Sequence, residues 1–171
     1  MVVQDLTIIK EKSTMMTNNI HSIELKKRET VGKVYYLNNY LNDLNNIVKN
    51  EVTENDLISL KEVDDFYNSL PQFQLYYSKT LRFEDKLNLY QDIKNNISDW
   101  DYSYMIYLTN GNYCGLLKIL SLSYFNWNFS FEDERYGLII LIREDGKEKI
   151  LLDFYEENSI EFIDIKIYKP I

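Results

Sequence analysis

The one enzyme-like pattern in the chain consists of two aspartates and a lysine near the C-terminal end. Asp153 lies in one predicted strand, and Asp164 and Lys166 lie in the next strand of the same predicted hairpin. Because side chains two residues apart in a strand point to the same face, Asp164 and Lys166 are expected to share a face. The alternative interpretation, which we favour, places all three on the solvated face of a half-buried hairpin with no catalytic role.

A carboxylate on one strand with Asp-x-Lys on the next resembles the motif of the PD-(D/E)xK nucleases. The resemblance covers only Asp153 to Lys166, and it implies that the two acids hold Mg²⁺ while the lysine orients or deprotonates the attacking water. The chain departs from that family in two ways. Leu152 precedes Asp153 where the family has proline, and the net charge of −8 is acidic where a DNA-binding nuclease needs positive charge.

Other catalytic and ligand-binding patterns are absent from the sequence. His21 is the only histidine and Cys114 the only cysteine, which is too few for a zinc site built on these residue types. We expect His21 at the surface and Cys114 as a buried, unreactive thiol on a strand. The five glycines are scattered, so no glycine-rich phosphate loop is present. We therefore expect no catalytic residue, no bound metal and no cofactor.

An aromatic stretch followed by three consecutive carboxylates connects two predicted strands and has the composition of a docking loop. It spans Phe125–Arg135, and between Phe131 and Asp164 the chain has 11 acidic residues against 4 basic ones. Charges steer association with a partner, and aromatic side chains supply buried anchors. The alternative is a solvated loop with Trp127 packed into the core. The predicted partner-binding residues are Trp127, Phe129, Phe131, Glu132, Asp133, Glu134, Asp153, Glu156 and Glu157.

Length and composition indicate one folded domain in a reducing compartment. The chain has 171 residues, 45% hydrophobic and 15% aromatic, which is enough for a sizeable core. The net charge of −8 argues against direct nucleic-acid binding, because phosphate contacts need basic residues. A single cysteine allows no intramolecular disulfide, and we find no signal peptide or membrane-spanning stretch. We expect a cytoplasmic protein without membrane contact.

The apolar periodicity changes near residue 100, from helical before it to alternating after it. The pattern predicts a short strand at Ile20–Lys26 and helices at Thr30–Val48, Thr53–Leu70 and Arg82–Ile97. Five strands follow at Tyr102–Thr109, Tyr113–Leu122, Tyr136–Arg143, Glu148–Tyr155 and Ile160–Tyr168. Turn residues between them, such as Asn110-Gly111, predict an antiparallel meander. The predicted fold is one α+β domain over residues 1–171, with helices at about 30–97 packed on one face of a sheet at about 102–168.

A small, acidic α+β domain with a carboxylate-rich surface resembles the immunity proteins of bacterial toxin–immunity systems. The complete absence of alanine and the abundance of Asn, Lys, Ile and Tyr favour an AT-rich bacterial genome or one of its phages. The resemblance is one of type, and it implies an inhibitor that binds a cognate, basic toxin domain such as a nuclease. The PD-(D/E)xK-like nuclease is the alternative. A phage-encoded inhibitor of a host defence enzyme is a further alternative that the sequence leaves open.

Overall fold

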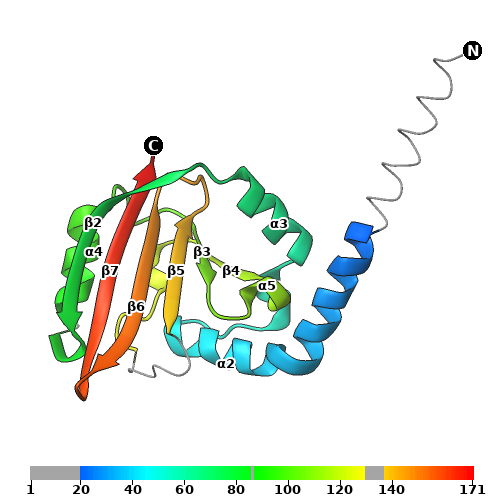
Figure 1. Cartoon of the computed structure of the whole chain (residues 1–171), viewed down its shortest axis with the longest axis horizontal. Coiled ribbons are helices and arrows are strands. Elements are labelled where there is room, and N and C mark those ends of the chain that lie inside the picture. Colours follow the sequence, from blue (N-terminus) through cyan, green and yellow to red (C-terminus); the bar gives the residue numbers. More distant parts are fainter. Residues whose placement is uncertain (1–19, 86, 130–136) are drawn as a thin grey trace, which may run out of the picture.

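A seven-stranded antiparallel sheet organises the part of the chain that is described (Figure 1). The computed structural model describes residues 20–85, 87–129 and 137–171. The strands lie in the order β1-β4-β3-β5-β6-β7-β2, and every neighbouring pair is antiparallel. The predicted α+β class with an antiparallel sheet is confirmed, and the sheet has two strands more than the five predicted. No helix within the described ranges is long and apolar enough to cross a bilayer.

The N-terminal described element is helical, so the strand predicted at Ile20–Lys26 is wrong. Helix covers residues 20–31, a π-helical turn follows at Gly32–Tyr36, and α2 continues as Leu37–Ile47. The Arg28 guanidinium ties this helix to the body, because it contacts the Asp64 carboxylate at 2.8 Å and donates to a backbone carbonyl oxygen across the chain.

The helix predicted at Thr30–Val48 is confirmed in the turn at Gly32–Tyr36 and in α2. Its inward side chains Tyr40, Leu44 and Ile47 are almost completely buried in the main core. The Tyr40 hydroxyl donates to the Gly115 carbonyl oxygen at 2.8 Å, so its one polar atom is paired inside the core. The helix therefore packs against the sheet as its periodicity indicates.

The segment predicted as one helix from Thr53 divides into three short elements. The capping box of Thr53 and Asp56 is present, but it begins a 3-10 turn at Glu54–Asp56. β1 (Leu57–Ile58) follows, and a second capping box begins α3 (Leu60–Ser69). In that box the Glu62 carboxylate accepts from both Ser59 groups, at 2.9 Å from the backbone N–H and 2.6 Å from the hydroxyl.

A long strand precedes the third helix and was not predicted. β2 (Phe73–Arg82) pairs with β7 along nearly its whole length, with a register shift between Leu75 and Tyr77. The chain then passes through a 3-10 turn at Phe83–Asp85 into α4 (Leu87–Asn96), which confirms most of the helix predicted at Arg82–Ile97. Most β2 side chains are exposed, so neither face gives a clear apolar alternation.

The remaining strands agree with the predicted positions but not with a simple meander. They are β3 (Tyr104–Tyr107), β4 (Leu116–Ile119), β5 (Leu138–Arg143), β6 (Lys149–Glu157) and β7 (Ile160–Pro170). β3 lies between β4 and β5, so the chain crosses back after β4. The β3–β4 connection is the short helix α5 (Gly111–Cys114) rather than a tight hairpin, because Asn110 at φ 74° starts a helical turn.

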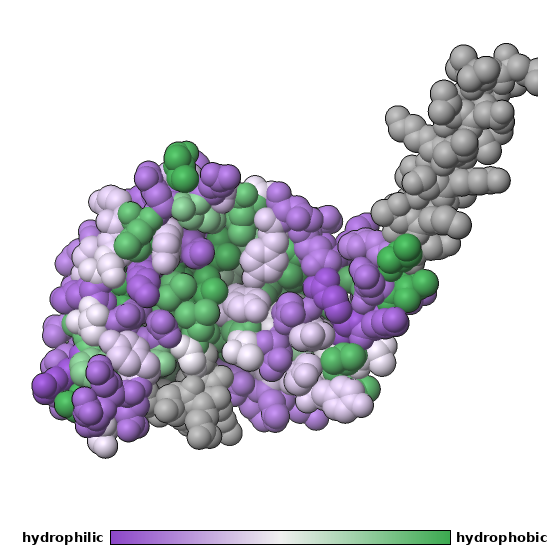
Figure 2. Space-filling model, viewed as in Figure 1, coloured by the Kyte–Doolittle hydropathy of each residue, from purple (hydrophilic) through white to green (hydrophobic). Residues whose placement is uncertain are grey.

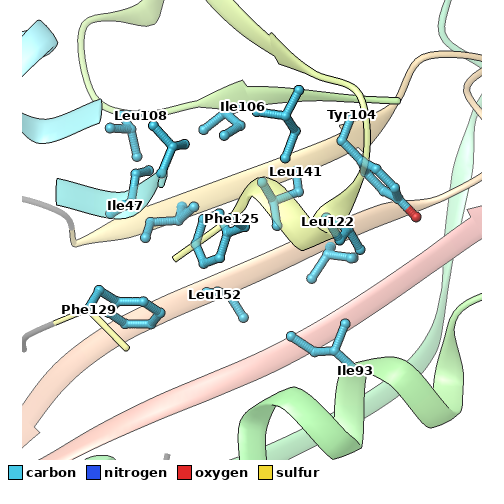
Figure 3. Packing of buried hydrophobic residues seen from close by; sticks show 14 of the residues in the cluster. Ile47, Ile93, Tyr104, Ile106, Leu108, Leu122, Phe125, Phe129, Leu141 and Leu152 are labelled. Carbon is cyan, nitrogen blue, oxygen red and sulfur yellow. The ribbon is translucent and has the colours of Figure 1, made fainter. Parts of the chain in front are cut away.

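The two faces of the sheet are covered unequally. On the face that we call the core face, α2, α4 and the segment after β4 pack against the inward residues of β3, β5, β6 and β7. Figure 3 shows Phe125 and Phe129 from that segment beside Leu141 and Leu152 of the sheet. On the opposite face, α3 packs through Val63 against the β1, β4 and β3 end of the sheet. The described residues therefore leave much of β5, β6 and β7 uncovered on that side.

Candidate functional site

The uncovered side of the sheet, which we call the open face, carries the predicted aspartate–lysine pattern. It is formed by the side chains that alternate with the buried core residues on β5, β6 and β7, and all of them are partly exposed. These residues are Leu138, Ile140, Leu151, Asp153, Tyr155, Phe162, Asp164 and Lys166.

Asp153 and Asp164 are direct cross-strand neighbours on β6 and β7. The Thr80 hydroxyl donates to Asp164 at 2.6 Å, and the Lys166 ammonium lies 3.7 Å from the same carboxylate. Tyr155 also donates to Asp164, at 3.4 Å, and its pKa is raised by partial desolvation and by that carboxylate. The sequence prediction that Asp164 and Lys166 share a face is consistent with these contacts. Asp153 has no polar partner among the described residues.

The open face combines these charges with a large apolar surface (Figure 2). The hydrophobic patch lies over β5 and β6 and reaches toward α3, where a cavity of about 540 Å³ is lined by nine residues. They are Tyr67, Leu70, Pro71, Phe73, Tyr107, Asn112, Ile140, Ile142 and Lys149. Farther along β6 and β7, the rings of Tyr155 and Phe162 stack with centroids 5.4 Å apart. A patch of this kind, rimmed by charges, is typical of a protein-binding surface.

Three further carboxylates lie at and beside the β6–β7 turn. Glu156, Glu157 and Glu161 are exposed, and Glu156 lies directly opposite Glu161 across the strand pair. Like charges directly opposite one another destabilise a strand pair. These glutamates therefore do not stabilise the β6–β7 pair. They give this end of the hairpin a negative charge that attracts cations.

The aromatic part of the predicted docking loop serves the core instead. Phe129 is only 2% exposed and packs edge-on against Phe154 at 5.6 Å, so its ring lies in the core and not at the surface where the docking prediction placed it. Trp127 is partly exposed, but its indole N–H donates to the Leu122 carbonyl oxygen at 3.0 Å. Its ring lies 4.6 Å from that of Phe125. The predicted residues Phe131, Glu132, Asp133 and Glu134 lie outside the described residues.

Three of the acids counted toward the charged surface are already paired or buried. Glu148 is fully buried and accepts from the Ser98 N–H at 3.0 Å and from the Tyr104 hydroxyl at 3.1 Å. Glu144 pairs with Lys118 at 2.6 Å. Asp145 forms two bonds with Arg143, which lower the pKa of that carboxyl to about 2. The sequence offers no signal that separates these acids from the free ones.

The lone histidine and cysteine form no site in the described structure. His21 is exposed on the N-terminal helix. Cys114 ends α5 rather than lying on a strand as predicted, and it is only partly buried. Desolvation raises the pKa of its thiol to about 11, so the reactive thiolate is scarce at neutral pH. Among the described residues, no three acids, histidines or cysteines are grouped to hold a metal ion.

Comparisons with known proteins leave the site to be interpreted on its geometry. No protein-family model, curated protein or solved structure matches the chain.

Proposed function

We propose that this protein is an inhibitor of the immunity type, which binds a cognate, basic toxin domain through its open face. The observation that carries the proposal is the open face itself, where an uncovered apolar surface adjoins the carboxylates of Asp153 and Asp164. The apolar part supplies buried area on binding, and the carboxylates select a basic partner. The proposal places the protein in the bacterial cytoplasm, where a toxin domain would act.

The placement of the free carboxylates supports a binding role over an acid–base role. An acid–base pair needs one carboxyl group held protonated in an apolar pocket. Glu156, Glu157 and Glu161 are instead exposed to solvent at the end of a hairpin. Exposed carboxylates of this kind attract a basic surface over a distance and speed its association.

Co-expression with the product of the adjacent upstream gene tests this proposal. We expect that product to arrest growth alone and to bind this protein tightly when both are purified. Leu151→Arg places a cation on the open face and should weaken binding by more than about tenfold. Leu120→Arg is the matched control, since Leu120 is 64% exposed on the chain just after β4. Equal affinity of both variants would contradict docking on the open face.

A metal-dependent nuclease is the second candidate, and the cross-strand pairing of Asp153 with Asp164 beside Lys166 favours it. Two adjacent carboxylates with water ligands suit Mg²⁺. If the candidate is right, Mg²⁺ or Mn²⁺ raises the melting temperature and the purified protein cuts DNA or RNA. Asp153→Asn should remove both effects, whereas Glu24→Gln on the N-terminal helix should remove neither. Wild-type protein that shows neither metal binding nor cleavage would eliminate this candidate.

A further inference from the structure

Among the described residues, the outer edge of β2 pairs with no other strand. β2 is the last strand of the sheet and pairs only with β7 (Figure 1). Its side chains at Ser78, Thr80 and Arg82 are exposed. An unpaired edge presents backbone N–H and C=O groups that another strand can bond.

The hydrogen-bond pattern of the sheet identifies which backbone N–H and C=O groups of β2 do not bond β7. Asn158 and Ser159 form a two-residue turn with φ of 52° and 60°, so the flanking Glu157 and Ile160 form a hydrogen-bonded pair. Bonded pairs recur every second residue, so even-numbered residues of β7 bond β6 and odd-numbered ones bond β2. The bond from the Ile171 N–H to the Gln72 carbonyl, at 3.1 Å, agrees with this assignment.

The same alternation applies to the pairing of β2 with β7. It shows that the backbone N–H and C=O groups of three β2 residues point away from β7. Ile163 pairs with Leu81 and Ile165 with Lys79, so the backbone groups of these β2 residues point to β7. Those of Ser78, Thr80 and Arg82 point away from the sheet. The register shift between Leu75 and Tyr77 ends this regular edge on one side, and the 3-10 turn after Arg82 ends it on the other.

A hollow with net negative charge lies at the Arg82 end of this edge. It has a volume of about 360 Å³ and is lined by Arg82, Glu84, Glu156, Ser159, Ile160 and Glu161. Three carboxylates therefore face one guanidinium, and that guanidinium contacts Glu84 at 3.4 Å. The remaining charge favours a cation, which complements the charge of a basic segment laid along the edge.

We propose that the β2 edge from Ser78 to Arg82 accepts an extended peptide segment as an added strand. A lysine or arginine of that segment occupies the carboxylate-lined hollow. Backbone bonds to the three outward residues provide binding that is independent of sequence, and the hollow provides the preference for a basic side chain.

Two synthetic peptides test the edge directly. Acetyl-KTVTVTK-amide presents a lysine to the hollow in either strand direction, and acetyl-ETVTVTE-amide has the same backbone with opposite charge. We expect the lysine peptide to shift the amide NMR signals of Ser78, Thr80 and Arg82 and to slow their hydrogen exchange. Its affinity should exceed that of the glutamate peptide by about tenfold.

Two variants at one position separate the backbone contribution from the side chain. Thr80→Pro removes an outward N–H that the fold does not use, and an edge strand tolerates proline at such a position. Thr80→Ala removes the same hydroxyl and keeps the N–H. We expect the proline variant to lose the peptide and the alanine variant to bind it. If Thr80→Pro does not fold, a triple variant with Glu84→Gln, Glu156→Gln and Glu161→Gln replaces it as the test. This variant must bind the lysine peptide and the glutamate peptide with equal affinity.

Three outcomes would overturn the proposal. They are shifts confined to the open face, equal binding of both peptides, and no binding of either peptide at all. Dimerisation of the free chain in sedimentation, blocked by Thr80→Pro, would assign the edge to a second copy and also overturn it. None of these outcomes tests the inhibitor function, which depends on Leu151 and its neighbours on the open face.

Discussion

The carboxylate of Glu148 is buried in the core rather than exposed at the surface. Its sequence neighbours Lys147 and Lys149 give no sign of burial, yet its side chain is fully buried. The Ser98 N–H and hydroxyl and the Tyr104 hydroxyl donate to it, so its buried oxygen atoms have hydrogen-bond partners. These bonds fasten the segment after α4 to the start of β6.

Removal of the Glu148 carboxylate should therefore destabilise the fold. Glu148→Ala removes a fully buried acceptor of three hydrogen bonds, one of them from the buried Tyr104 hydroxyl, and we expect a loss of about 3 kcal/mol. Glu144→Gln is the control, since it breaks an exposed ion pair with Lys118 and should cost less than about 1 kcal/mol. Urea unfolding followed by circular dichroism measures both. Equal stability of the two variants would mean that the buried bonds contribute little.

Trp127 gives a second prediction on stability. Its ring lies 5.4 Å from Trp100 and 4.6 Å from Phe125, within one aromatic cluster. Trp127→Ala should leave a cavity and cost about 3 kcal/mol, and Phe129→Ala should cost at least as much. Thermal melting measures the loss. A Trp127→Ala protein that melts like wild type but fails to bind its partner would instead support the prediction that Trp127 contacts the partner.

Asp145 predicts a loss of stability in acid. Arg143 lowers the folded-state pKa of Asp145 from 3.8 to about 2, so folding favours the ionised carboxyl. That stabilisation is complete above the unfolded pKa and disappears as the pH falls from about 4 to about 2. Asp145→Asn should unfold with a flatter pH dependence over this range, with a difference of about 1 kcal/mol after solvent screening. Superimposable pH profiles for the two proteins would contradict the prediction.

At the scale of elements, periodicity predicted those that bury one clear face. α2, α4, β6 and β7 have buried residues at helical or alternating steps, so their positions could be read from the sequence. The same alternation placed Asp164 and Lys166 together. β2 is mostly exposed and its register shifts near Tyr76, which removes the alternating signal. The burial of Phe129 depends on contacts with β6, which no local pattern encodes.

The β6–β7 turn predicts a stabilising substitution. Ser159 has φ of 60°, a left-handed conformation that costs about 1 kcal/mol for a residue with a Cβ. Glycine adopts it freely, and Asn-Gly is the preferred pair for this turn. Ser159→Gly should raise stability by up to about 1 kcal/mol, while Ser159→Ala should not. Gly146→Ala is a converse control and should destabilise, because φ is 70° and a Cβ would meet the Pro71 ring at 3.0 Å.

At the scale of the whole molecule, the helices cover the two faces of the sheet unequally, and the exposed carboxylates of the sheet lie toward one end. Two helices and the segment after β4 bury the core face, whereas α3 covers the β1, β4 and β3 end of the opposite face. Three exposed carboxylates, Glu156, Glu157 and Glu161, lie near the β6–β7 turn at the other end of the sheet, whereas Glu144, Asp145 and Glu148 are paired or buried. An approaching basic protein would thus meet the charged end first and the apolar surface next to it.

This asymmetry predicts that association with the partner depends on salt. The association rate constant should fall at least about tenfold between about 50 and 500 mM salt, because the Debye length shortens from over about 10 Å to a few Å. Stopped-flow fluorescence with the purified partner measures the rate. The dissociation rate constant should change much less, since it depends on the contacts of the buried apolar area.

Two charge-matched variants identify the surface responsible. Asp153→Asn removes one negative charge from the open face, and Glu24→Gln removes one from the exposed N-terminal helix. Net charge changes equally, so a difference between them reports where the partner approaches. The Asp153 variant should associate several-fold more slowly at low salt and like wild type at high salt, with Glu24→Gln unchanged throughout. Equal slowing by both variants would mean that net charge, and not the open face, guides the encounter.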